Sequence, residues 1–322
     1  MTMTPTIGST GTIAPASPES VDLTSPETAL QPSPRSDTPS RVRIVEVGPR
    51  DGLQNESAHV PTDAKIAFIE GLADAGLPVV EATSFVSPTA VPQLSDADEV
   101  LPRVHRRPDV RYPVLVPNMR GLERAERAGA DAVAVFTAAS DEFTERNIGM
   151  SIAESLAAFE PVLDRAIELG WWRRGYVSTA FGCPYSGDVE PARVVQVCSA
   201  LLELGCDEIS VGDTIGVAEP DDVRRVCDEL LMHVPVGRVA LHLHDTRGRA
   251  LDNVRAGLER GISIYDSSAG GTGGCPFAPG APGNLATEAL CAMLDEMGIE
   301  HGVDAAKVEV AALALRAAMT PS

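Results

Sequence analysis

From residue 43 onward, the chain alternates between short runs of β-branched and other apolar residues and longer segments with apolar side chains three or four positions apart. The short runs are typical of buried strands, and the longer spacing is typical of amphipathic helices. Eight runs are expected to be strands, at residues 43–47, 79–83, 111–116, 132–136, 175–180, 208–212, 239–244 and 262–266.

A helical segment follows each strand run. The first has an apolar stripe at Ile66, Ile69, Leu72 and Ala73, and Thr62 before it is the expected N-cap. Several helical segments end in a glycine just before the next strand, where a left-handed residue can cap the helix. These glycines are Gly76, Gly129, Gly170, Gly205 and Gly261.

Eight βα units in about 260 residues predict an α/β fold, a TIM (β/α)8 barrel with a disordered N-terminal tail. The alternative, an open doubly wound sheet, would carry a G-x-G-x-x-G turn after its first strand, and the chain has none there. In residues 1–40, 22 positions are Ser, Thr or Pro, so this tail buries too little apolar surface to fold. The catalytic domain is expected at 41–322.

Composition narrows the choice of partners and compartment. The formal net charge of -20 argues against nucleic acid and anionic membranes, which need clustered Lys and Arg. No run approaches the roughly 20 apolar residues of a membrane helix. The six cysteines lack paired spacing, which favours a reducing cytoplasm. Four are expected to be packing residues, namely Cys198, Cys206, Cys227 and Cys291.

Polar residues gather where a barrel enzyme places its chemistry, at the carboxyl ends of the strands. They are Arg50, Asp51, Glu81, Asn118, Asp213, His242, His244 and Asp266. The sharpest signal is His242 and His244, because residues two apart on a strand point to the same face. Two imidazoles and a carboxylate from another strand end can hold a divalent cation. The alternative is that either histidine is a satisfied core residue.

Arg50 and Asp51 follow the first strand side by side. Asp51 suits a hard cation and Arg50 suits a carbonyl oxygen or an enolate, although a surface salt bridge within the turn is an equal alternative. Glu81 and Asp213 end apolar strands, so each should pair with an arginine, water or metal, and an ion pair with Arg50 is one option for either.

A glycine-rich run at 270–274 ends in Cys275. Such a loop is expected to be a mobile lid, and a thiol with a tuned pKa can donate or accept a proton when the lid closes. The alternatives are a phosphate cradle, for which the G-x-x-x-x-G-K-[ST] motif is missing, and a flexible connector with an incidental cysteine.

Six motifs, in this order, resemble the hydroxymethylglutaryl-CoA lyases of the metal-dependent barrel family that includes the isopropylmalate and homocitrate synthases. They are VEVGPRDGLQN (45–55), EATSFVSPTAVPQ (81–93), RGYVSTAFGCPY (174–185), GDTIG (212–216), HLHDT (242–246) and DSSAGGTGGCPFAPGAPGNLATE (266–288). The resemblance spans about residues 41–305.

The resemblance implies Mg²⁺ or Mn²⁺ as cofactor, with the metal ligands Asp51, His242, His244 and Asn284. It also implies catalytic roles for Arg50 and Cys275, with His242 as a candidate proton relay and Asp213 and Glu81 orienting the ligands. The implied substrate is an acyl-CoA, 3-hydroxy-3-methylglutaryl-CoA, cleaved to acetyl-CoA and acetoacetate, and the implied assembly is a homodimer.

Two alternatives remain within the same barrel. One is a lyase for a longer 3-hydroxy-3-alkylglutaryl-CoA, such as the isohexenyl compound, and the other is a Claisen-condensing acyl-CoA synthase of the isopropylmalate synthase type. Two positions depart from the pattern of the family: Arg247 stands where Tyr is expected, and Thr89 stands where Lys is expected. The second removes a possible basic contact for coenzyme A.

Overall fold

All eight predicted strands are present in the computed structural model, which describes residues 38–274 and 283–319. The predicted tail therefore lies almost wholly outside the described residues. The second predicted strand is divided into two short pieces, so nine strands are labelled. They are β1 (Arg43–Glu46), β2 (Val79–Val80), β3 (Thr83–Ser84), β4 (Val114–Leu115), β5 (Ala132–Ala138), β6 (Trp172–Ser178), β7 (Glu208–Asp213), β8 (Val239–Leu243) and β9 (Ile264–Ser267).

The strands form one parallel sheet that closes into a barrel, as predicted. The strand order is β2-β1-β9-β8-β7-β6-β5-β4-β3, and its two ends belong to a single chain segment, 79–84. On one side of this segment, the Glu81 N–H donates to the Glu46 carbonyl (2.8 Å). On the other side, the Val80 N–H donates to the Arg111 carbonyl (2.9 Å). The same segment thus joins β1 to β4 and leaves no free sheet edge.

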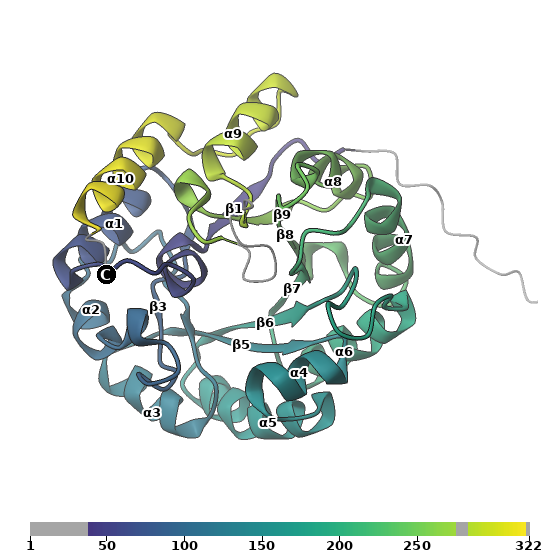
Figure 1. Cartoon of the computed structure of the whole chain (residues 1–322), viewed down its shortest axis with the longest axis horizontal. Coiled ribbons are helices and arrows are strands. Elements are labelled where there is room, and N and C mark those ends of the chain that lie inside the picture. The colour runs from purple at the N-terminus through teal and green to yellow at the C-terminus, as the bar shows by residue number, and fades with distance from the viewer. Residues whose placement is uncertain (1–37, 275–282, 320–322) are drawn as a thin grey trace, which may run out of the picture. The chain divides into compact units, whose positions relative to one another are not determined.

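Helices surround the ring of strands on the outside (Figure 1). They are α1 (Thr62–Asp74), α2 (Ala97–Arg103), α3 (Met119–Arg127), α4 (Asp141–Ile148), α5 (Ile152–Glu168), α6 (Pro191–Glu203), α7 (Pro220–Leu230), α8 (Ala250–Leu258), α9 (Thr287–Glu296) and α10 (Ala305–Ala318). Short helical turns are η1 (Gly48–Gly52), η2 (Pro92–Leu94), η3 (Val236–Arg238) and η4 (Ala269–Gly271).

The predicted helix ends are confirmed, and one predicted helix start is wrong. All five predicted capping glycines have positive φ, between +71° and +97°. Thr62 is the first residue of α1 and not its N-cap, which is Pro61. The Thr62 hydroxyl instead donates to Asp96 Oδ2 (2.7 Å), because α2 packs beside α1 and Asp96, the residue before α2, offers a carboxylate there.

The interior of the barrel holds both apolar and polar side chains. Val45, Val79, Ala240 and Ile264 pack together in one apolar cluster. The buried charged and hydroxyl side chains are Glu81, Arg174, Glu208, Ser210 and Asp266. The main apolar core lies between the sheet and the helices, and it includes the four cysteines predicted to pack there.

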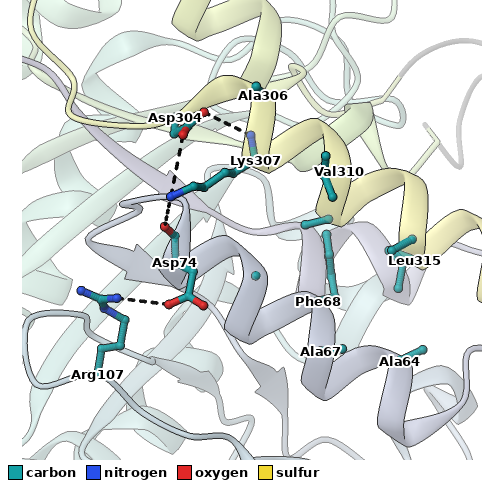
Figure 2. Close-up of a pocket in the computed structure, with 13 residues that line it drawn as sticks. Ala64, Ala67, Phe68, Asp74, Arg107, Asp304, Ala306, Lys307, Val310 and Leu315 are labelled. Carbon is teal, nitrogen blue, oxygen red and sulfur yellow. Dashed lines mark hydrogen bonds and ion pairs between the residues drawn. The ribbon is translucent and has the colours of Figure 1, made fainter.

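An apolar groove of about 750 Å³ runs between α1 and α10 on the outer surface (Figure 2). Ala64, Phe68 and Val310 contribute to its walls, and the ion pair between Arg107 and Asp74 (3.1 Å) lies at one end. Within residues 38–274 and 283–319, no helix is both long and apolar enough to cross a membrane.

Candidate active site

A cavity of about 710 Å³ opens at the carboxyl ends of the strands. Its polar side is formed by residues that the sequence singled out, Arg50, Asp51, His242 and His244. Its other side is mostly apolar and comes from β4, β5 and the helices after them. The apolar lining includes Leu115, Pro117, Phe136, Phe143, Ile148, Met150 and Phe159. The cavity therefore joins a charged end to a hydrophobic wall.

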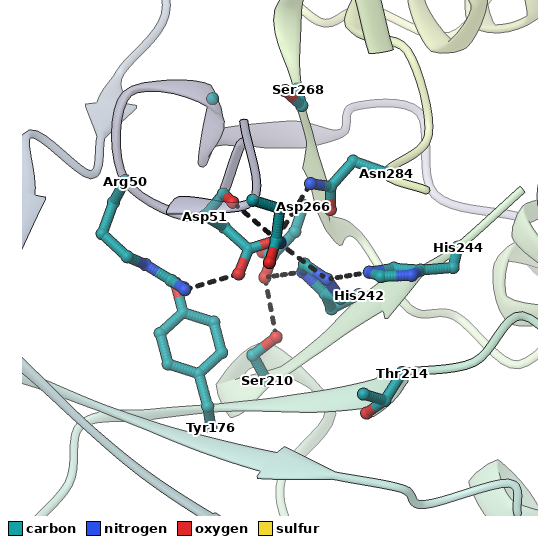
Figure 3. Close-up of polar contacts among 12 residues, drawn as sticks. Arg50, Asp51, Tyr176, Ser210, Thr214, His242, His244, Asp266, Ser268 and Asn284 are labelled. Atoms are coloured by element: carbon teal, nitrogen blue, oxygen red, sulfur yellow. Dashed lines mark hydrogen bonds and ion pairs between the residues drawn. The ribbon is translucent and has the colours of Figure 1, made fainter. Parts of the chain in front are cut away.

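Asp51, His242 and His244 meet at the charged end, with one ligand atom from each lying within 4.8 Å of the others (Figure 3). His242 Nε2 is 3.2 Å from His244 Nε2 and 3.9 Å from Asp51 Oδ2. The two histidines lie on and just after β8, so the period-two argument holds. Two imidazole nitrogens and a carboxylate oxygen that converge on one point fit a divalent cation.

Asn284 lies next to this cluster. Its Nδ2 is 2.9 Å from Asp51 Oδ2, and a backbone bridge between His244 and Asn284 holds the two residues side by side. A half-turn of the amide would present its oxygen to the same point, which makes Asn284 a fourth possible ligand. Reasoning from strand ends did not find Asn284, because it lies in a loop beyond the last strand. Only the family resemblance pointed to it.

Charge and burial keep these side chains ready to bind a cation. Burial opposes ionisation of Asp51, but Arg50 and the two imidazoles outweigh it and lower the pKa of Asp51 to about 2. Burial also lowers the pKa of His244 to about 4, with His242 as a second cause. At neutral pH, Asp51 is therefore an anion and His244 is a neutral imidazole.

Arg50 and Asp51 lie on η1, the tight turn that follows β1. Arg50 Nη1 donates to Asp51 Oδ1 (2.6 Å) and Arg50 Nε donates to Glu81 Oε2 (2.7 Å). The guanidinium also lies over the ring of Tyr176, 5.1 Å from its centre. Because Arg50 is buried, its pair with Asp51 is not a surface salt bridge. Glu81 contacts Arg50 and not the group of Asp51, His242 and His244.

Asp213 does not form the ion pair with Arg50 that the sequence allowed. Its carboxylate accepts the backbone N–H groups of Val217 and Ala218, each at 3.0 Å. Burial raises the pKa of Asp213 to about 6, although these hydrogen bonds lower it. The structure thus places Asp213 where it holds the loop after β7, and Glu81 is the carboxylate that reaches Arg50.

A buried ionic cluster lies behind the site, and of its members the sequence singled out only Asp266. Arg174 donates to Asp266 through Nη1 (3.1 Å) and Nη2 (2.5 Å), and to Glu208 through Nε (2.9 Å). Asp266 Oδ2 in turn lies 3.2 Å from His242 Nδ1. Period two would have found Arg174 and Glu208 as well, because both occupy inward positions of their strands, as Asp266 does.

The glycine-rich run before Cys275 is packed against the site as far as Gly273, which is buried. Gly273 has φ +96°, and a Cβ there would come within 2.8 Å of Gly52 Cα. Backbone geometry and close packing therefore account for glycine at this position. Cys275 itself lies outside the described residues, so its predicted catalytic role and the predicted lid stay predictions.

Comparisons with known proteins agree with this geometry. The family model described as HMGL-like matches residues 41–313. The chain is 50% identical over 280 residues to the cytoplasmic 3-hydroxy-3-methylglutaryl-CoA lyase of Rattus norvegicus. The aligned region covers 87% of this chain and 82% of that protein. It is 53% identical over 270 residues to the mitochondrial hydroxymethylglutaryl-CoA lyase of Bos taurus. Here the aligned region covers 84% of this chain and 83% of that protein.

A solved structure has the same fold. The crystal structure of the HMG-CoA lyase from Brucella melitensis matches with a TM-score of 0.85 and 51% sequence identity, over 86% of this chain and 98% of that chain. Because the family model spans most of the sequence and these relatives are about half identical to it, the chain belongs to the HMGL-like family.

Proposed function

We propose that this chain is a divalent-metal-dependent lyase that cleaves 3-hydroxy-3-methylglutaryl-CoA into acetyl-CoA and acetoacetate. The observation that carries this proposal is the convergence of Arg50 with Asp51, His242 and His244 at one end of a cavity, in a chain about half identical to lyases named for that substrate. The alternatives, a longer-chain substrate and a condensing synthase, are not favoured by any of the relatives described above.

Asp51, His242, His244 and Asn284 are the proposed ligands of Mg²⁺ or Mn²⁺. A cation bound there would supply Lewis acidity that makes the tertiary hydroxyl of the substrate more acidic. When the hydroxyl loses its proton, its oxygen forms a carbonyl with C3 and the bond between C2 and C3 breaks. The electron pair of that bond moves to the thioester, so the products are acetoacetate and the enolate of acetyl-CoA, which then takes up a proton.

Arg50 is placed to stabilise the enolate oxygen. Its Nε and Nη1 donate to Glu81 and Asp51, which fix the plane of the guanidinium, and its Nη2 makes no hydrogen bond to a described residue. This donor is available to a substrate oxygen at the end of the cavity. A preorganised donor of this kind contributes about 3 to 4 kcal/mol to transition-state stabilisation in comparable oxyanion sites.

Cys275 is the proposed proton donor to the enolate carbon, or the acceptor of the hydroxyl proton. The protein loaded with Mg²⁺ should form acetoacetate and acetyl-CoA in equal amounts. The Cys275→Ala variant should lose roughly 10²- to 10⁴-fold in kcat, and Cys227→Ala, in the buried face of α7, is the cysteine control.

A substrate panel tests the specificity of the reaction. Cleavage of 3-hydroxy-3-methylglutaryl-CoA alone supports the proposal. Cleavage of only the isohexenyl analogue would overturn the substrate, and condensation of acetyl-CoA with a 2-oxo acid without any cleavage would overturn the reaction class.

The assembly and the compartment are proposals as well. We infer a homodimer, for which light scattering should give about twice the chain mass of 33.8 kDa. We also infer a cytoplasmic location, which the scattered free cysteines support. The relatives described above carry both cytoplasmic and mitochondrial names, so fractionation of the source cells is the measurement that decides.

A further inference from the structure

The imidazole of His242 has different surroundings on its two sides. Its Nε2 faces the ligand cluster, 3.2 Å from His244 Nε2 and 3.9 Å from Asp51 Oδ2. Its Nδ1 faces into the barrel, 3.2 Å from Asp266 Oδ2 (Figure 3). Which nitrogen carries the proton decides whether Nε2 can offer a lone pair to a metal.

Asp266 can only accept hydrogen bonds in this position. Its Oδ1 receives Arg174 Nη2 (2.5 Å), and its Oδ2 receives Arg174 Nη1 (3.1 Å) and the Ser210 hydroxyl (2.8 Å). A fully buried carboxylate paired with a guanidinium through two hydrogen bonds is an anion with no proton to donate. The hydrogen bond between Asp266 and His242 therefore requires a proton on His242 Nδ1.

The ionic cluster continues away from the site and holds Arg174 in place. Arg174 Nε donates to Glu208 Oε1 (2.9 Å), and Glu208 also pairs with Arg43 near the opposite end of the barrel. Arg174 is fully buried and cannot rotate towards solvent. Its second carboxylate partner thus keeps the guanidinium aimed at Asp266.

His244 lacks an equivalent support. Its Nδ1 is buried and has no hydrogen-bond partner among the described residues. The two histidines are therefore unequal: a carboxylate contacts Nδ1 of His242 from behind, whereas no described residue forms a hydrogen bond with Nδ1 of His244.

We propose that Asp266 is a positioning residue that binds the Nδ1 proton of His242 and so reserves the Nε2 lone pair for a divalent cation, with Arg174 holding Asp266 in the acceptor state. The proposal rests on the metal site of the proposed function and adds the group that prepares one of its ligands. Asp266 acts through His242 and does not itself touch the cation.

The first test needs no mutation and no metal. Nitrogen NMR of metal-free protein labelled at histidine, at a pH well above the ordinary histidine pKa, should show His242 protonated at Nδ1 and unprotonated at Nε2. The resonance is identified by its loss in His242→Gln. The opposite tautomer, with the proton on Nε2, would overturn the proposal.

The second test measures Mn²⁺ affinity by electron paramagnetic resonance, without substrate. Asp266→Asn should weaken Mn²⁺ binding by roughly 10- to 100-fold, which is the usual effect of removing an outer partner of a metal-bound histidine. Asp207→Asn is the control: Asp207 pairs with Arg173, outside the cluster of Arg174, Glu208 and Asp266, so the Mn²⁺ affinity of this variant should stay at the wild-type value.

A double variant keeps the proposal testable if Asp266→Asn does not fold. Arg174→Met with Asp266→Leu removes both charges together, which often preserves stability, and it should also bind Mn²⁺ more weakly by a similar factor. Wild-type affinity in the folded double variant would overturn the role of Asp266. Failure of the wild-type protein to bind Mn²⁺ would instead overturn the metal site, so the two failures are distinguishable.

Discussion

At the scale of single residues, the position of Arg50 depends on two carboxylates that contact different nitrogens of its guanidinium. Glu81 contacts the guanidinium at Nε, and Asp51, which lies beside His242 and His244, contacts it at Nη1. Burial opposes the ionisation of Glu81 and raises its pKa, while the Arg50 charge lowers it. The planar fork of the guanidinium can serve both partners and still present a third nitrogen to substrate.

We therefore expect Arg50→Lys to fail although it keeps the charge. A single ammonium cannot hold Glu81 and Asp51 and also reach the enolate oxygen, so kcat should fall by roughly 10²- to 10³-fold. Steady-state kinetics should show most of the loss in kcat. Arg193→Lys is the control, because Arg193 pairs with Asp141 at the partly exposed start of α6 and should change little. A change confined to KM would contradict the role given to Arg50.

At the scale of elements, Glu46 ties the end of β1 to two later segments. Its carboxylate accepts the N–H groups of Gly48 (2.8 Å) and Ala269 (2.9 Å) and the hydroxyl of Thr287 (2.7 Å). These contacts join β1 and η1, which carry Arg50 and Asp51, to η4 and α9. The site thus depends on an outward-facing carboxylate that does not line the cavity.

This carboxylate predicts a pH dependence of stability. Burial raises the pKa of Glu46 from 4.5 to about 7, against the three hydrogen bonds. At a pH between 4.5 and 7, Glu46 keeps its proton in the native state but has lost it in the unfolded chain. The free energy of unfolding therefore falls as the pH rises from 4.5 to 7. The full effect is roughly 3 kcal/mol.

Glu46→Gln is neutral at every pH and should remove this contribution. Denaturant unfolding of both proteins across that pH range gives the measurement. The difference between variant and wild type should grow with pH in favour of the variant, and parallel curves would mean that Glu46 is ionised throughout.

Two helix-ending glycines offer a matched pair for the packing of helices on the barrel. Gly76 has φ +93°, and a Cβ there would lie 2.5 Å from the Gly302 carbonyl oxygen. Gly170 has φ +71° and open space around it. Both positions carry the left-handed backbone cost of about 1 to 2 kcal/mol, but only Gly76 adds a clash with backbone.

Gly76→Ala should therefore lower the free energy of unfolding clearly more than Gly170→Ala does. Urea denaturation of the two variants measures both values. Equal losses would show that the link between α9 and α10 shifts freely to make room.

At the scale of the whole molecule, the barrel brings charges from opposite ends of the sequence into one interior. Asp51 follows the first strand and Asn284 follows the last strand. Asn284 Nδ2 nevertheless lies 2.9 Å from Asp51 Oδ2, because the sheet is closed. A ligand that contacts both, together with the histidines of β8, links distant parts of the chain. Binding to the native state alone then adds directly to stability.

Removal of the metal should accordingly lower the stability of the entire barrel. At a free Mg²⁺ or Mn²⁺ concentration of about 100 times Kd, loading adds about 2.7 kcal/mol. Calorimetry should show a melting temperature several degrees higher with the metal than with a chelator. Asp51→Asn should abolish most of this shift, whereas Asp109→Asn, an exposed residue paired with Arg107 before β4, should retain it. A shift that survives in Asp51→Asn would place the metal elsewhere.

Much of the fold could be predicted because the spacing of apolar residues and the glycines that end helices are local properties of the sequence. The eight strand runs, the capping glycines and the buried cysteines all match the structure. Thr62 was wrong as an N-cap, since whether a hydroxyl caps its own helix depends on what the neighbouring helix offers, and here Asp96 binds it.

The sequence by itself determined the fold class, the rim of the barrel where the site lies, and His242 and His244 as a same-face pair, since these follow from spacing along the chain. Only the tertiary structure decided which charges meet. In the structure, Glu81 forms an ion pair with Arg50, Asp213 accepts hydrogen bonds from backbone N–H groups, and Asp266 contacts Nδ1 of His242. The physical reason is that ion pairs and hydrogen bonds act over about 3 Å in space, and closure of the sheet brings together residues that lie up to 241 positions apart in sequence.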